Sequence, residues 1–94
     1  MAIYLVTYDL RGTNETSEDY KRLIEKIKSY SSWARPTYSD WLIETTKTAS
    51  QVRDELWSFM DSTDRLLVLT ARAPAAWNGS IPEDVSTWMK DKLK

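Results

Sequence analysis

The run from Ile3 to Asp9 constrains the fold of this chain more than any other feature. It is composed almost wholly of apolar, β-branched and aromatic residues, and it ends abruptly on a carboxylate. Residues of these types favour a buried β-strand, and the following stretch, Leu10–Asn14, is typical of a loop. The sequence therefore predicts a buried strand that places Asp9 at the edge of a sheet.

Two roles are open to Asp9 from the residues alone. A carboxylate at the point where a buried strand opens into a loop can hold a divalent cation, because Mg²⁺ and Mn²⁺ prefer oxygen ligands and an apolar wall limits competition from water. An aspartate also accepts hydrogen bonds readily from the backbone N–H groups of a turn. For a single aspartate this second role is the more common one.

Composition limits the chemistry that the chain can perform. It has neither cysteine nor histidine, which excludes disulfides, thiolate and imidazole metal ligands, and nucleophilic cysteines and histidine-assisted triads. Carboxylates, hydroxyls, amines and guanidinium groups remain.

A length of 94 residues fits one domain over residues 1–94, with a core at 2–71 and a C-terminal extension at 72–94.

Charge and hydropathy indicate which partners to expect. The net charge is −1 and no basic run is present, so nucleic-acid binding would need Lys and Arg to cluster locally in the fold. We expect a cytoplasmic protein without a membrane partner, since the sequence contains no basic leader and no apolar stretch of spanning length. The chain has five Trp and five Tyr but one Phe, and such amphipathic rings suit core rims, interfaces and base stacking.

The order of periodic segments predicts the fold class. Helical spacing runs from Thr16 to about Tyr30 and again after a capping box at Thr48–Gln51, and a short helix begins at Glu83. Further strands are expected at Trp33–Arg35, which stops at Pro36, at Tyr38–Thr45 and at Arg65–Ala71. This order indicates an α+β, ferredoxin-like βαββαβ sandwich, an antiparallel sheet with two helices on one face plus a short C-terminal helix. The two most apolar strands, first and last, are expected inside the sheet, and the Pro36 segment is expected at its edge.

Short motifs carry a resemblance to a known family. They are Tyr8-Asp9, the strand motif Tyr38-Ser39-x-Trp41, and a last strand led by Asp64. Over residues 2–71 the chain resembles the small CRISPR-associated Cas-two family and its VapD-like and SinR-like relatives. The resemblance implies a metal-dependent endonuclease in which Asp9 pairs with its twin across a homodimer and binds Mg²⁺ or Mn²⁺.

The same resemblance suggests which residues contact nucleic acid. Family members carry Arg near the strand ends, and Arg11, Arg35 and Arg65 are the counterparts here, with Arg11 or Arg35 steadying phosphate oxygens. Ser39 matches the family's Ser-x-Phe motif, although Asp40 introduces a charge after it. No separate general base is evident. The alternative is a non-catalytic homodimeric adaptor or inhibitor that binds a protein or a nucleic acid.

Overall fold

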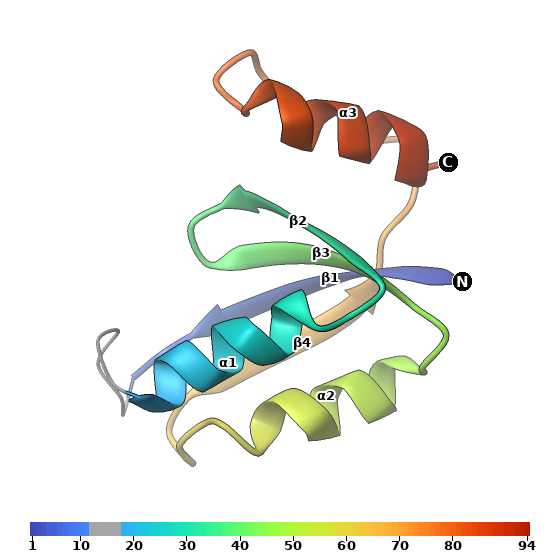
Figure 1. The fold of residues 1–94 in the computed structure, drawn as a ribbon. Helices are drawn as coiled ribbons and strands as arrows, with labels where there is room; N and C mark the ends of the chain where they lie inside the picture. The colour runs from blue at the N-terminus through green and yellow to red at the C-terminus, as the bar shows by residue number, and fades with distance from the viewer. Residues whose placement is uncertain (12–17) are drawn as a thin grey trace.

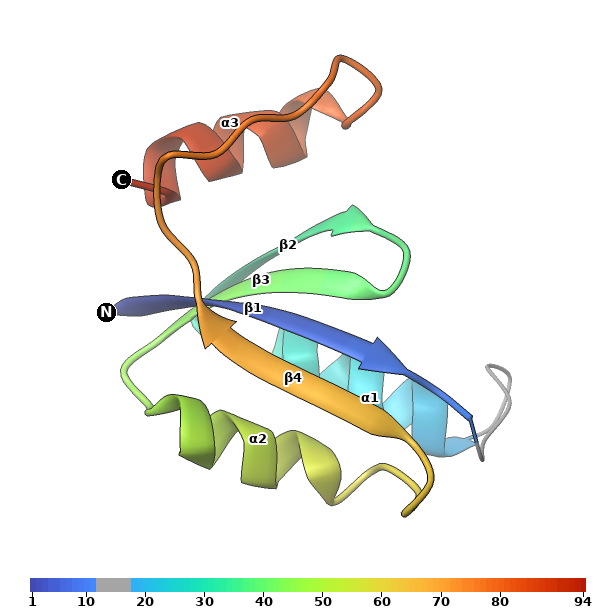
Figure 2. The same cartoon turned by 180° about the vertical axis from the view of Figure 1, so that it is seen from behind.

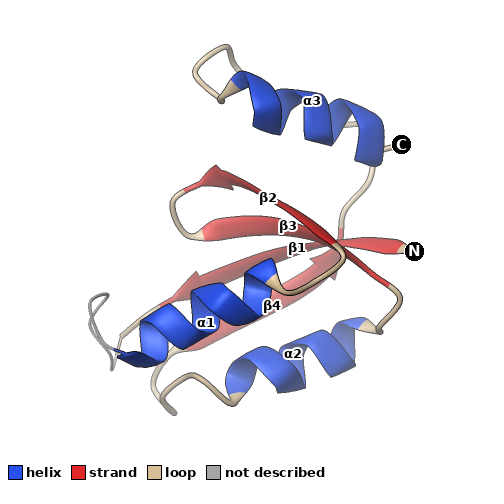
Figure 3. Cartoon of the chain, viewed as in Figure 1, coloured by secondary structure: helices blue, strands red, loops and turns tan. Residues whose placement is uncertain are grey.

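The computed structural model describes residues 1–11 and 18–94 (Figure 1). Within these residues the chain forms a four-stranded antiparallel sheet and three helices (Figure 3). In chain order the elements are β1 (Ala2–Asp9), α1 (Glu18–Lys28), β2 (Ser32–Thr37), β3 (Asp40–Thr45), α2 (Ala49–Trp57), β4 (Arg65–Thr70) and α3 (Glu83–Lys92). The strand order is β2-β3-β1-β4. This α+β architecture is compatible with a ferredoxin-like fold.

Strand β1 lies inside the sheet, as its apolar sequence predicts. It pairs antiparallel with β3 on one side and with β4 on the other. Because successive side chains point to opposite faces, Tyr4, Val6 and Tyr8 enter one core while Ile3 enters another. Both faces of β1 therefore need apolar residues, which explains its nearly continuous hydrophobic run.

Helices α1 and α2 pack on the same face of the sheet, where they form the larger core (Figure 1). Its fully buried side chains include Val6, Leu23, Ile27, Trp41, Ile43, Val52 and Leu56. Helix α1 begins at Glu18 in the described residues, and the expected start at Thr16 lies outside them. The helix ends at Lys28 rather than Tyr30, whose buried ring still joins this core.

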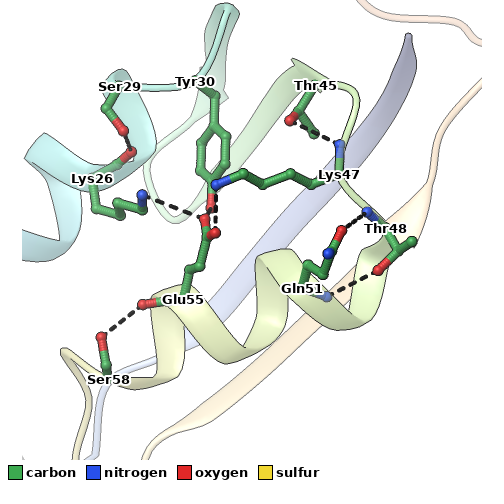
Figure 4. Close-up of polar contacts among 9 residues, drawn as sticks. All are labelled: Lys26, Ser29, Tyr30, Thr45, Lys47, Thr48, Gln51, Glu55 and Ser58. Atoms are coloured by element: carbon green, nitrogen blue, oxygen red, sulfur yellow. Dashed lines mark hydrogen bonds and ion pairs between the residues drawn. The ribbon is translucent and has the colours of Figure 1, made fainter.

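Helix α2 confirms the capping box. The Thr48 N–H donates to Gln51 Oε1 at 2.8 Å, and the Gln51 N–H donates to Thr48 Oγ1 at 3.1 Å (Figure 4). The helix is shorter than its apolar spacing indicates, because it ends at Trp57. Phe59 and Met60 pack against the core from the turn that follows, in which each N–H bonds the carbonyl three residues earlier.

Helix α3 covers part of the opposite face of the sheet. Its buried Met89 packs with Ile3 and Leu42 in a second, smaller core. The Trp88 indole N–H donates to Ser32 Oγ at 2.7 Å, and Lys92 Nζ lies 3.2 Å from Glu44 Oε1. Seen from behind, α3 sits toward the β2 side of the sheet, and no helix of the described chain lies in front of β1 and β4 (Figure 2).

The expected interior position of the last strand is wrong. Strand β4 is at the edge of the sheet, and its Leu67 and Leu69 side chains are 53% and 40% exposed. Leu66 and Val68, on its other face, pack against the larger core. Half of the apolar residues of β4 thus face a surface that α3 does not reach.

Strand β2 forms the other edge, as Pro36 predicts. The strand is longer than expected because it continues through Pro36 to Thr37. Its pairing with β3 shifts register between Ala34 and Thr37, around the residue that has no N–H to donate.

Candidate functional site

Asp9 ends β1 at an exposed position where two surface hollows meet. One hollow, of about 200 Å³, is lined by Thr7–Asp9 and Arg65–Leu67. The other, of about 130 Å³, is lined by Tyr8–Leu10, Tyr38 and Ser39. The Asp9 carboxylate therefore lies at the surface between the start of β4 and the β2–β3 turn.

Ser39 lines the same hollow as Asp9. It occupies the tight turn between β2 and β3 and lines the smaller hollow together with Asp9. The turn is held by the Thr37 hydroxyl, which donates to Asp40 Oδ2 at 2.8 Å. The structure thus brings together two predicted site residues that are far apart in the sequence.

Arg35 is engaged within the chain and lines neither hollow. Its Nε donates to the Tyr38 carbonyl at 2.9 Å, and its Nη2 donates to the same carbonyl and, at 3.1 Å, to the Tyr20 hydroxyl. The guanidinium carbon lies 4.9 Å from the Tyr38 ring centroid and 4.5 Å from that of Trp41. These contacts hold the β2–β3 turn and leave a positive charge beside it.

The Arg11 backbone is held by a carboxylate other than Asp9. Its N–H donates to Oδ1 of the buried Asp64 at 2.7 Å, and Oδ2 of Asp64 accepts from the Asp61 N–H at 2.8 Å. Among the described residues the Asp9 carboxylate has no hydrogen bond or ion pair. Asp64 therefore accepts the backbone hydrogen bonds at this turn. This is the second of the two roles that the sequence left open for Asp9. The Arg11 side chain is exposed.

Arg65, a third arginine near a strand end, lies closer to Asp9 in the sheet register than the sequence alone indicates. It is the cross-strand partner of Asp9 in the β1–β4 register, and it lines the larger hollow. The signal for it was present in the sequence, because antiparallel pairing of the two apolar strands sets the start of the last one opposite the end of the first.

Tyr8 forms the buried wall behind Asp9. Its hydroxyl accepts a hydrogen bond from the Trp41 indole N–H at 3.0 Å. Burial raises the pKa of Tyr8 above its ordinary value, and the neighbouring Tyr20 adds to this rise. The hydroxyl therefore stays protonated at neutral pH and does not serve as a general base.

The carboxylates of one chain are spread apart. The described residues contain no group of three or more acidic side chains placed to hold a metal ion. Mg²⁺ requires octahedral oxygen coordination and is commonly bound through one or two carboxylates, waters and a substrate phosphate. A site at Asp9 therefore fits such an ion only when a second copy of the chain or a phosphate supplies further oxygens.

Comparison with known proteins assigns no family. No protein-family model matches the chain, and no solved structure matches it significantly. None of the helices in the described residues has the length and apolar character needed to cross a membrane.

Proposed function

We propose that the chain is a ferredoxin-like βαββαβ protein that works as a homodimeric, divalent-metal-dependent phosphodiesterase acting on nucleic acid, as its resemblance to the Cas-two family implies. One observation carries the proposal. Asp9 is exposed and unengaged among the described residues, while Asp64 holds the adjacent turn. Within the described part of the chain, the Asp9 carboxylate is therefore available to a ligand.

The face that α3 leaves uncovered supports the dimer. By the strand register, Leu67 and Leu69 share one face of the sheet with Asp9 and Arg65. Packing this face against the same face of a second copy would bury the exposed leucines and bring two Asp9 residues toward a common axis. Helix α3 leaves this half of the face accessible because it packs near Ile3 and Leu42.

The residues of this face suit phosphodiester chemistry. Two Asp9 carboxylates would hold Mg²⁺ or Mn²⁺, which supplies an activated water and offsets charge on the phosphate. Arg65 adds a guanidinium on the same face, where it can bind the non-bridging phosphate oxygens. Ser39 offers a hydroxyl at the rim, and Arg11 an exposed guanidinium in the segment after β1.

Asp9→Asn tests the metal site. Mg²⁺ or Mn²⁺ should raise the melting temperature of the wild type, because an ion that binds only the folded protein stabilises it by linkage. The variant should lose this rise and any metal-dependent cleavage of RNA or DNA while keeping the wild-type circular dichroism spectrum. Asp91→Asn, at an exposed carboxylate of α3 outside both hollows, should behave as the wild type. Cleavage that survives in Asp9→Asn would refute the assignment.

A second function, that of a non-catalytic adaptor, is favoured by the exposed leucines of β4. Leu67 and Leu69 form an apolar surface that a protein partner could cover without any metal. The two functions differ in one measurement. An adaptor shows the same melting temperature with and without divalent ions, in the wild type and in Asp9→Asn alike.

A further inference from the structure

Two cations near the β2 edge contact aromatic rings. Lys28 Nζ lies 5.2 Å from the centroid of the Trp33 ring, and the Arg35 guanidinium lies against Trp41 and Tyr38. Within the part of the chain that the structure describes, neither cation has a carboxylate partner. By contrast, Lys26, Lys47, Arg53 and Lys92 each pair with an acidic side chain. Among these residues, no paired carboxylate offsets the positive charge of Lys28 and Arg35.

The rings and cations form a continuous track. Trp33 lies against Trp41 with ring centroids 5.6 Å apart, and Arg35 joins Trp41 to Tyr38. The rings of Trp33 and Tyr38 are accessible, since these residues are 38% and 62% exposed. Tyr38 also lines the hollow that contains Asp9 and Ser39. The track, defined as Lys28, Trp33, Arg35 and Tyr38, therefore leads from the C-terminal end of α1 to the candidate site.

We infer that this track binds single-stranded nucleic acid and guides it toward Asp9. The inference rests on the proposed function for the direction of the strand, but not for binding itself. Exposed rings beside unpaired cations match a ligand that presents aromatic bases and phosphates in alternation. A duplex keeps its bases stacked inside, so it cannot offer their faces to Trp33 and Tyr38.

Each member of the track has a separate role. A base stacks on the exposed part of the Tyr38 ring, which also contacts Arg35. A second base takes the place of the Lys28 ammonium on Trp33, and the displaced ammonium then meets the adjoining phosphate. Arg35 is fixed by the Tyr38 carbonyl and the Tyr20 hydroxyl, so it supplies its charge without further loss of side-chain freedom.

Fluorescence anisotropy with a short labelled single-stranded oligonucleotide tests this inference. EDTA is included so that binding is measured without metal-dependent cleavage. Trp33→Ala and Tyr38→Ala should each weaken binding about fivefold or more, the low end of what one stacked base contributes. Lys28→Gln should reduce the slope of log K against log salt by about 0.7, the value for one phosphate contact on a single strand.

Matched controls lie elsewhere on the molecule. Trp57 is 40% exposed on α2, and Lys21 is an exposed lysine of α1, so Trp57→Ala and Lys21→Gln should bind as the wild type. Trp33→Phe keeps an aromatic ring and should retain most of the affinity. It therefore distinguishes loss of stacking in Trp33→Ala from a folding defect in that variant.

Three results would overturn the inference. They are failure of the wild type to bind the single strand, equal affinity for a duplex of the same sequence, and equal losses in the track and control variants. The response to metal separates this inference from the proposed function. A wild-type protein that binds the strand in EDTA, but whose melting temperature and cleavage activity do not respond to Mg²⁺ or Mn²⁺, would refute the nuclease and leave the track intact.

Discussion

At the scale of single residues, Glu55 makes the densest set of polar contacts in Figure 4. Its carboxylate accepts a hydrogen bond from Lys47 Nζ and another from the Tyr30 hydroxyl at 2.7 Å, and it lies 3.4 Å from Lys26 Nζ. These groups come from α1, from the turn after it and from the segment before α2. Glu55 therefore ties the two helices to each other beside the larger core.

Glu55 predicts how stability changes in acid. The hydrogen bond from Lys47, with smaller contributions from Tyr30 and Lys26, lowers the pKa of Glu55 from 4.5 to about 2. Because the folded-state pKa is depressed, the stabilisation is complete above about pH 4.5 and is lost as the pH falls toward 2. Glu55→Gln should lower the free energy of unfolding by about 1–3 kcal/mol at pH 7, and urea titrations should show this difference shrinking between pH 4.5 and 2.

The control for Glu55 is Glu25→Gln, at an exposed position of α1. Its free energy of unfolding should stay within about 0.5 kcal/mol of the wild type at pH 7, as for most surface substitutions. A Glu55→Gln difference that is constant from pH 7 to pH 2 would contradict the assigned role.

Residue roles could be predicted from the sequence only where the local pattern was enough. The end of an apolar run places Asp9 at a strand end. Ser39 was expected within a strand over Tyr38–Thr45, whereas it lies in the turn before β3, which begins at Asp40. The choice between Asp9 and Asp64 as the carboxylate that holds the turn depends on a contact over 53 residues, from Arg11 to Asp64. Periodicity does not report such a contact, nor does it report that Arg35 is bound by the carbonyl of Tyr38.

At the scale of elements, α3 contributes stability through Met89. Met89 is buried against Ile3 and Leu42, and truncation leaves a cavity that the surroundings fill only partly. Met89→Ala should therefore lower the free energy of unfolding by about 2–5 kcal/mol, measured by urea denaturation. Lys90→Ala, at the next and exposed position, should cost less than about 0.5 kcal/mol. Equal effects of the two substitutions would mean that α3 does not form part of the cooperative fold.

Element types were easier to predict than element positions. The capping box of α2, the edge position of β2 and the C-terminal helix are confirmed, because each depends on residues close together in the chain. The position of β4 was wrong because hydrophobicity alone does not distinguish a strand covered on both faces from one covered on a single face. The exposure of Leu67 and Leu69 shows that β4 is covered on one face only.

At the scale of the whole molecule, the proposed dimer can be tested through Leu67. Light scattering of the wild type at micromolar concentration should give about twice the single-chain mass of 11.0 kDa. Leu67→Lys should give a monomer, because it places a charge in the face that two copies bury. Thr87→Lys, at an exposed position of α3, should remain dimeric. A monomeric wild type would remove the paired Asp9 site.

The two edges of the sheet differ in their capacity to add a further strand. The β4 edge carries no proline and no register shift, so its outward N–H and C=O groups can template another strand. At the β2 edge, Pro36 and the shifted register disrupt such pairing. Two chains that joined through their β4 edges would present only β2 edges outward. Strand addition would then stop at two chains, because a third chain could not pair with the outward β2 edges. The fold would in this way resist fibre formation.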